Sequence, residues 1–166
     1  MGNPELICED KNVLAGPPEN DIQIPDSVMR YAAGRPLDVV WLNDLGGLTF
    51  CIPGSVKDIF IKWAPTNSGL DLATEQIKLE WAITYTPVPK VLECGEDKEG
   101  SWLITEGIDA ENAVSERWKR NPTLAVAAIG RGLRAMHDVL PVKDCPFTWS
   151  TQDRISRARG KVALGE

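Results

Sequence analysis

The sequence predicts an α+β protein, in which an antiparallel sheet with one helix is followed by a helical segment. Short apolar runs at residues 37–42, 48–52 and 59–63 are separated by the turn residues 43–47 and 53–55. Apolar runs of this length between glycine-containing turns indicate antiparallel strands in a meander. The last third of the chain instead carries apolar residues three and four apart, which is the period of an amphipathic helix.

The other elements of the sheet region follow from their start and stop signals. A short helix is predicted at residues 25–33, because a proline opens it and a glycine follows it. A longer helix is predicted at residues 71–84. Residues 88–94 and 102–105 form a strand pair joined by a polar loop.

Two helices are predicted near the end of the chain. Pro122 stands at the first position of one helix, where proline is tolerated, and Pro141 ends that helix. Ser150 begins a capping-box pattern for the other helix. At the opposite end, residues 1–24 are polar and proline-rich, so we expect an irregular arm with one short strand at residues 6–8.

Composition and charge exclude several classes of protein. The chain has 166 residues, with 18 Lys and Arg against 24 Asp and Glu, and its formal net charge is −6. Bulk binding to nucleic acid needs a basic footprint that this balance does not supply. No apolar run has the length of a membrane span, and the first residues lack the pattern of a secretory signal peptide. We therefore expect a cytoplasmic protein.

The four cysteines lie far apart, so no metal site is predicted.

Lys62 and Glu75 are the strongest candidates for a functional pair. Lys62 lies in an apolar strand, and it shares a face with Phe60 because side chains alternate across a strand. Glu75 lies three residues after Leu72 and four before Leu79, on the apolar face of its helix. The spacing indicates a buried ion pair, and removing one partner of such a pair costs about 3–5 kcal/mol. One interpretation is a phosphate-positioning lysine held by a helix glutamate. The other is a solvated lysine beside a peripheral glutamate.

Two further patterns are weaker. In the turn at residues 43–47, Gly46 and Gly47 would let backbone N–H groups approach an anion closely. The segment matches neither of the glycine-rich phosphate-binding motifs, and a plain hairpin turn is the alternative. The strand at residues 102–105 ends close to Gly107. One interpretation is that exposed backbone groups there bind the edge of a base, and the alternative is that the strand simply ends.

A series of short motifs follows a particular order along the chain. The motifs are Phe60-Ile61-Lys62, Glu75, Trp81, Pro87-Val88-Pro89-Lys90-Val91-Leu92, Trp102-Leu103-Ile104-Thr105-Glu106, Leu133-Arg134-Ala135-Met136-His137 and Asp144-Cys145-Pro146-Phe147. In this order they resemble the aminoglycoside phosphotransferases, specifically the kanamycin and neomycin 3'-phosphotransferase branch. The resemblance extends from about Trp41 to the end of the chain.

The resemblance implies a protein-kinase-like fold. Residues 1–106 would form a nucleotide-binding N-terminal lobe with its arm, and residues 107–166 would form the hinge and the first helices of a C-terminal lobe. Lys62 would contact the α- and β-phosphates of ATP, and Glu75 would orient it. The ring of Phe60 would stack on adenine.

The resemblance also implies roles for two backbone segments. The nucleotide-covering loop would contain Gly46, Gly47 and Thr49. The hinge, whose backbone binds the adenine edge, would contain Thr105, Glu106 and Gly107.

The catalytic residues of the family have no counterpart in this sequence. In the family, phosphoryl transfer uses an H-G-D-x-x-x-x-N segment and a later aspartate that binds the metal. No such segment occurs here, so the catalytic aspartate and the Mg²⁺ ligands are expected beyond Glu166. The chain would be the ATP- or GTP-binding portion of a truncated antibiotic-resistance enzyme, which phosphorylates an aminoglycoside hydroxyl. The chain alone should be inactive.

Alternatives to this function remain open. The parent protein could be another small-molecule kinase of the superfamily, acting on a macrolide, choline or a fructosamine, or the chain could be a non-catalytic nucleotide-binding or pseudo-kinase module. The expected partners are a nucleotide and, for the full-length protein, an aminoglycoside, with no nucleic acid or membrane.

Self-association is also expected, because it would cover apolar stripes on the last helices. These stripes contain Ile129, Leu133, Met136, Ile155 and Val162.

Overall fold

The computed structural model describes residues 15–18, 22–148 and 150–165. These residues divide into two compact units. The first, which we call the sheet unit, contains the described residues up to 80 and residues 88–110. The second, which we call the helical unit, contains residues 81–87 and the described residues from 111 onward. The predicted strand at residues 6–8 lies outside the described residues.

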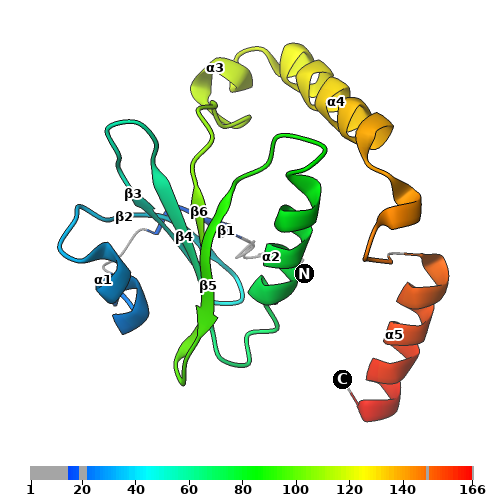
Figure 1. The fold of residues 1–166 in the computed structure, drawn as a ribbon, viewed down its shortest axis with the longest axis horizontal. Helices are drawn as coiled ribbons and strands as arrows, with labels where there is room; N and C mark the ends of the chain where they lie inside the picture. Colours follow the sequence, from blue (N-terminus) through cyan, green and yellow to red (C-terminus); the bar gives the residue numbers. More distant parts are fainter. Residues whose placement is uncertain (1–14, 19–21, 149, 166) are drawn as a thin grey trace, which may run out of the picture. The chain divides into compact units, whose positions relative to one another are not determined.

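The sheet unit is built on one antiparallel sheet, with the strand order β1-β2-β3-β4-β6-β5 (Figure 1). The strands are β1 (Ala15–Gly16), β2 (Asp38–Asn43), β3 (Leu48–Ile52), β4 (Ile59–Pro65), β5 (Val91–Glu96) and β6 (Gly100–Glu106). The helices of this unit are α1 (Asp26–Ala32) and most of α2 (Leu72–Ala82). The predicted α+β class and the predicted meander are therefore confirmed.

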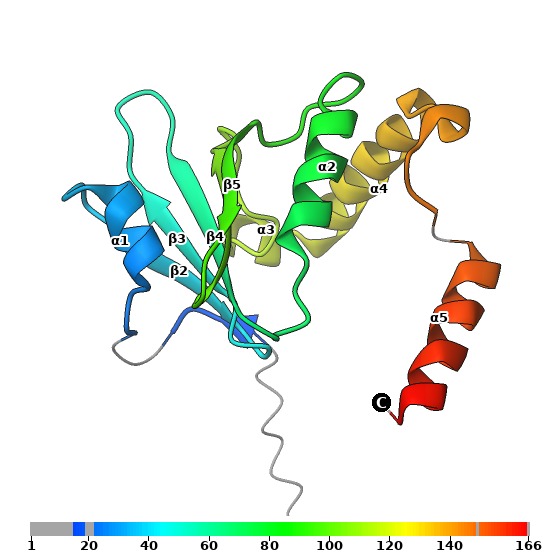
Figure 2. The same ribbon diagram turned by 60° about the horizontal axis from the view of Figure 1, so that its bottom comes forward.

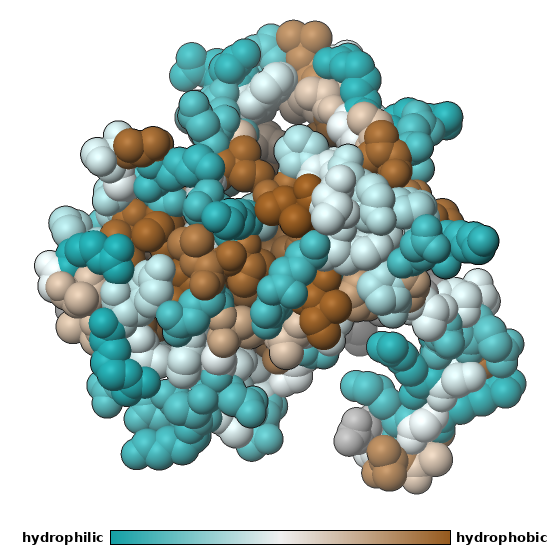
Figure 3. All heavy atoms as spheres, viewed as in Figure 1, coloured by the Kyte–Doolittle hydropathy of each residue, from teal (hydrophilic) through white to brown (hydrophobic). Residues whose placement is uncertain are grey.

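Each face of the sheet is covered by one helix, and Figure 2 shows α1 and α2 on opposite sides of the strands. On one face, Phe50, Ile61 and Ile104 are neighbours across β3, β4 and β6, and all three are fully buried. Helix α1 packs Val28 and Ala32 into this cluster. Figure 3 shows that hydrophobic residues are also exposed at the surface over the strands, with hydrophilic residues around them.

The opposite face has a smaller core, and this face carries the candidate site. Ala64 and Leu103 from the strands are buried together with Leu72 of α2, and Leu79 packs against them. These contacts confirm that the predicted apolar face of the helix packs on the sheet. Helix α2 begins where Asp71 accepts hydrogen bonds from the Thr74 N–H (2.8 Å) and from its hydroxyl (2.6 Å).

Three short elements were not predicted, and one strand begins later than expected. The short elements are β1, α3 (Glu116–Lys119) and the 3-10 helix η1 (Val142–Asp144). Each has at most four residues, which is too few to show a period in the sequence. Strand β5 begins at Val91 rather than at residue 88, because Pro87 and Pro89 lack the N–H that a strand ladder needs.

The helical unit contains α3, α4 (Pro122–Val139), η1 and α5 (Thr151–Leu164). Pro122 occupies the start of α4, and the Ser150 side chain caps α5 by accepting from the Asp153 N–H, as predicted. Neither α4 nor α5 has a buried residue. None of the described helices is both long and apolar enough to cross a membrane.

Candidate functional site

The candidate site lies on the face of the sheet that carries Lys62. Lys62 is in β4, where it is opposite Thr49 of β3 and Leu103 of β6. Two residues earlier on the same strand, Phe60 is opposite Thr105 of β6. Because alternate residues of a strand share a face, these side chains lie on one surface, which we call the Lys62 face.

The predicted contact between Lys62 and Glu75 is present. The Lys62 Nζ donates a hydrogen bond to the Glu75 Oε1, and the two groups form an ion pair. The expectation that this pair is buried is wrong, since the side chains are 47% and 35% exposed. The physical reason is that α2 covers the sheet with Leu72 and Leu79, which leaves Glu75 at the solvent margin. An exposed pair contributes about 0–1 kcal/mol to stability, so its geometry rather than its energy is of interest.

Phe60 and Gly107 form the end of the Lys62 face nearest the start of β4. Both are half-buried. A Cβ atom added to Gly107 would lie 3.1 Å from the Phe60 ring and 3.0 Å from the Asp58 carbonyl oxygen. Glycine at this position therefore permits the chain that leaves β6 to pass directly against the aromatic ring.

The backbone at the end of β6 is held on both sides. The Glu106 N–H donates to the Lys90 carbonyl (2.9 Å), and the Gly107 N–H donates to the Asp58 carbonyl (2.7 Å). Two backbone N–H groups of the segment that was predicted to bind an adenine edge are therefore already engaged within the protein. The prediction that residues 105–107 form a hinge is not tested by these contacts, but they limit which groups a base can reach.

The Glu106 side chain is held by two lysines. Its Oε2 accepts from the Lys57 Nζ at 2.8 Å, and its Oε1 lies 3.7 Å from the Lys90 Nζ. The hydrogen bond from Lys57 is the main cause that holds the pKa of Glu106 below its ordinary value, and the charges of both lysines add to it. Sequence reasoning gave no role to Lys57 or Lys90, although Lys90 stands in one of the motifs that carry the resemblance, because contacts between distant loop segments leave no period in the sequence.

The turn with Gly46 and Gly47 is a hairpin closed by one side chain. The Asn43 Oδ1 accepts from the N–H groups of Leu45 (3.0 Å) and Gly47 (2.8 Å), and the Asn43 carbonyl accepts from the Gly46 N–H (3.1 Å). The donors that would face an anion are thus used inside the turn, as the hairpin alternative requires. An added Cβ at Gly47 would lie 2.5 Å from the Leu70 side chain and 2.6 Å from the Asn43 side-chain amide nitrogen, so both side chains would have to shift. The nucleotide-covering role of this loop stays a prediction.

The order of these residues along the sheet follows from its register. Thr105 and Phe60 lie toward the start of β4, Lys62 lies at its middle, and the turn with Gly46 lies beyond its other end, where Leu48 is opposite Trp63. The Lys62 face therefore offers an aromatic ring, then a cation, then a glycine-containing turn in one line. This order suits an elongated ligand with a flat group at one end and an anionic group further along.

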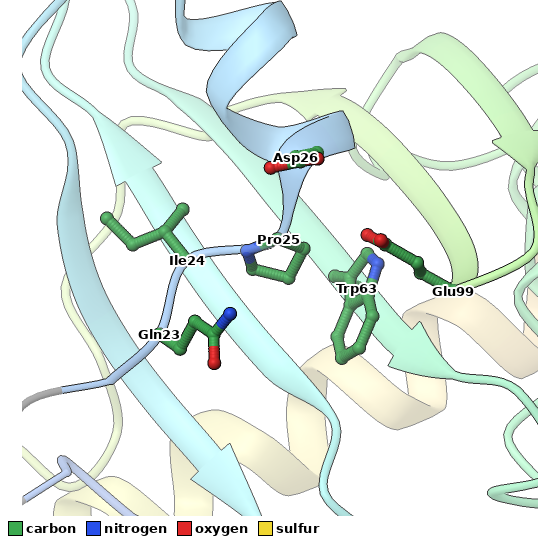
Figure 4. A pocket seen from close by; sticks show the side chains of 6 residues that line it. All are labelled: Gln23, Ile24, Pro25, Asp26, Trp63 and Glu99. Atoms are coloured by element: carbon green, nitrogen blue, oxygen red, sulfur yellow. The ribbon is translucent and has the colours of Figure 1, made fainter.

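Two cavities of about 320 Å³ lie in the sheet unit, and Lys62 lines neither of them. One is on the α1 side and is lined by Gln23, Ile24, Pro25, Asp26, Trp63 and Glu99 (Figure 4). Trp63 shares a strand face with Ile61, so this cavity is on the sheet face opposite to Lys62. The other is at the end of β6, beside Lys57 and Gly107.

Among the described residues, no group of three or more His, Cys, Asp or Glu side chains could hold a metal ion. In the part of the chain that the structure describes, the three cysteines Cys51, Cys94 and Cys145 are free thiols. Burial is the main cause that raises the pKa of the Cys51 and Cys94 thiols. The candidates for ligand binding in this part of the chain are therefore the Lys62 face and the ion pairs at the end of β6.

The comparison with solved structures defines the class of this fold. The chain matches an aminoglycoside 3'-phosphotransferase of type VIII with a TM-score of 0.64 and 32% identity. The match covers 80% of this chain and 49% of that structure. The fold is therefore that of the kinase-like aminoglycoside phosphotransferases, as the motifs indicated.

The sequence comparisons point to the same family. The chain is 39% identical over 104 residues to an aminoglycoside 3'-phosphotransferase of Streptomyces fradiae, which covers 61% of this chain. It is 35% identical over 110 residues to one of Streptomyces ribosidificus. No family model matches the chain. The matches cover 38% and 41% of these two relatives, so the chain spans about two fifths of their length. Over that span the chain is homologous to the aminoglycoside 3'-phosphotransferases.

Proposed function

We propose that this chain is the ATP-binding portion of an aminoglycoside phosphotransferase, an enzyme that transfers phosphate from ATP to an aminoglycoside hydroxyl. The observation that carries the proposal is the partly exposed ion pair of Lys62 and Glu75, with Phe60 two residues before the lysine on the same strand face. The homology to aminoglycoside 3'-phosphotransferases supports the proposal, and it favours an aminoglycoside as the substrate.

In the proposed site, Lys62 contacts the α- and β-phosphates. Its side chain is 47% exposed, so a phosphate oxygen can approach the ammonium group while Glu75 holds the side chain in place. A lysine held in this way stabilises the charge on a transferring phosphoryl group. Phe60 offers its ring to the base, and Thr49 lies beside Lys62 on the phosphate side.

Hydrogen bonds to the edge of the base require backbone N–H and C=O groups that are not already hydrogen-bonded within the protein. In an antiparallel strand, the N–H and C=O of one residue point to the same side. Gly107 points toward β4, whereas Glu106 points toward the segment that contains Lys90. Ile108 lies two residues beyond the end of β6, and its N–H makes no hydrogen bond to any described residue. We therefore assign base recognition to the Glu106 carbonyl and the Ile108 N–H, one position later than the sequence suggested.

The same proposal assigns Mg²⁺ binding and the catalytic aspartate to residues outside this sequence. It rests on the family's H-G-D-x-x-x-x-N segment, which the 166 residues do not contain. The chain alone would therefore bind nucleotide weakly and transfer no phosphate. When bound, Mg²⁺ would supply charge neutralisation of the phosphates.

The test is Lys62→Ala in the full-length parent protein. We expect kcat/KM for phosphorylation of kanamycin or neomycin to fall by about 100-fold or more, since Lys62 would stabilise transition-state charge. The melting temperature should stay close to the wild-type value, because Lys62 is exposed. Lys98→Ala, which removes an exposed lysine from the loop between β5 and β6, is the matched control and should retain full activity.

The same assay distinguishes the alternatives. Activity on a macrolide, choline or a fructosamine, with none on aminoglycosides, would assign the parent protein to another branch of small-molecule kinases. Absence of any transfer, with nucleotide binding intact, would indicate a non-catalytic nucleotide-binding module. Unchanged turnover in the Lys62→Ala protein would refute the assignment of Lys62.

A further inference from the structure

The end of β6 is joined to two other segments by a small group of ion pairs. Lys57 comes from the loop between β3 and β4, and Lys90 comes from the residue just before β5. Both ammonium groups converge on the Glu106 carboxylate, with one oxygen facing each lysine. We call Lys57, Lys90 and Glu106 the Glu106 ion-pair cluster.

The backbone repeats the same connections. Lys90 accepts from the Glu106 N–H through its carbonyl, so this residue contacts Glu106 through both its main chain and its side chain. On the other side, Asp58, the neighbour of Lys57, accepts from the Gly107 N–H. The peptide groups before and after the Glu106 Cα are therefore fixed from two sides, by segments that are far apart in the sequence.

The consequence concerns the direction of the Glu106 carbonyl. A carbonyl turns with its peptide plane, and two backbone hydrogen bonds restrain the planes on either side of this residue, while two ion pairs restrain its side chain. An exposed ion pair on its own holds a side chain weakly. Here two lysines contact the two oxygens of one carboxylate, and two backbone hydrogen bonds are added. Together these contacts reduce the number of backbone conformations that the end of β6 can adopt.

We propose that Lys57, Lys90 and Glu106 are positioning residues of the nucleotide site, which hold the Glu106 carbonyl in the direction that reads the base. This inference rests on the proposed function, because it needs a base to bind at the end of β6. The carboxylate and the two ammonium groups act through the backbone and do not themselves contact the base.

The test uses the full-length protein and measures the Kd for a non-hydrolysable ATP analogue by calorimetry. For Glu106→Gln, and for the double variant Lys57→Met with Lys90→Met, we expect Kd to rise about fivefold, the scale of two exposed ion pairs. The KM for ATP should rise in proportion, whereas kcat and the KM for the aminoglycoside should stay within about twofold. The exchanged pair, Lys57→Glu with Glu106→Lys, should recover part of the lost affinity.

Arg30→Met is the matched control. Arg30 and Asp97 form an ion pair in the same unit, with exposed fractions of 65% and 26%, close to the 57% and 27% of Lys57 and Glu106. Losing that pair should leave the Kd for the ATP analogue unchanged.

The outcomes separate the inference from the proposed function. If the wild-type protein binds the analogue and the cluster variants bind it equally well, the inference is wrong and the proposed function stands. If the variants lose kcat, both KM values and melting temperature together, the cluster is only structural and the inference is also wrong. If the wild-type protein binds no nucleotide, both fail. If it binds nucleotide without acting on aminoglycosides, only the proposed function fails.

Discussion

The sheet unit and the helical unit use their apolar residues in different ways. The sheet unit has buried large apolar side chains on both faces of its sheet, with Phe50, Ile61 and Leu103 completely inaccessible. In the helical unit, α4 has the spacing of an amphipathic helix and yet no buried residue, and Ile129 and Leu133 are each 49% exposed. The comparison teaches that an amphipathic pattern of apolar residues gives a core only where another surface covers the apolar face.

The largest expected difference between the units is in stability. Phe50→Ala should lower the free energy of unfolding of the chain by about 3–5 kcal/mol, because it opens a cavity in a fully packed core. Leu133→Ala, made on the exposed face of α4 and measured at a concentration where the chain is monomeric, should change it by less than about 0.5 kcal/mol. Urea denaturation of both variants measures the contrast, and equal losses would mean that α4 has a covered face.

The second expected difference is in association. We expect the 166-residue chain to self-associate through the exposed apolar side chains of α4 and α5, which include Ile129, Leu133, Ile155 and Val162. The double variant Ile129→Glu with Leu133→Glu should raise the dissociation constant about 100-fold, since each buried aliphatic side chain contributes about 1.5–3 kcal/mol. Sedimentation equilibrium measures this constant.

The association test has a clear contrary result and a control. A monomer at millimolar concentration would show that these faces do not associate. The matched change on the sheet unit is Val56→Glu, at a residue that is 92% exposed in the loop between β3 and β4, and it should leave the dissociation constant unchanged.

The smallest expected effect concerns the start of α2 and its dependence on pH. Hydrogen bonds from the Thr74 hydroxyl and N–H lower the pKa of Asp71. Because the folded-state pKa is depressed, the stabilisation is present above the unfolded pKa of about 3.9 and is lost as the pH falls through the folded value. Asp71→Ala should cost about 1 kcal/mol at pH 7. The difference from wild type should shrink as the pH is lowered toward 3, and a constant difference in urea titrations would contradict this assignment.

Much of the sheet unit was predictable because its signals are local. The bounds of β3, the alternation that puts Phe60 and Lys62 on one face, and the spacing that puts Leu72 and Leu79 on the inner side of α2 all follow from periods of two and of three to four residues. The contact between Lys62 and Glu75 also followed from these periods, together with the packing of α2 on the sheet.

The sequence by itself therefore determined which residues form strands and helices, which side chains share a face, and which family the motifs resemble. Only the tertiary structure decided how exposed the Lys62–Glu75 pair is, and that the donors of the glycine turn are used by Asn43. It alone also decided that Lys57 and Lys90 meet at Glu106. The physical reason is that exposure and hydrogen-bond partners depend on strand register and helix placement, which bring together residues with no fixed separation along the chain.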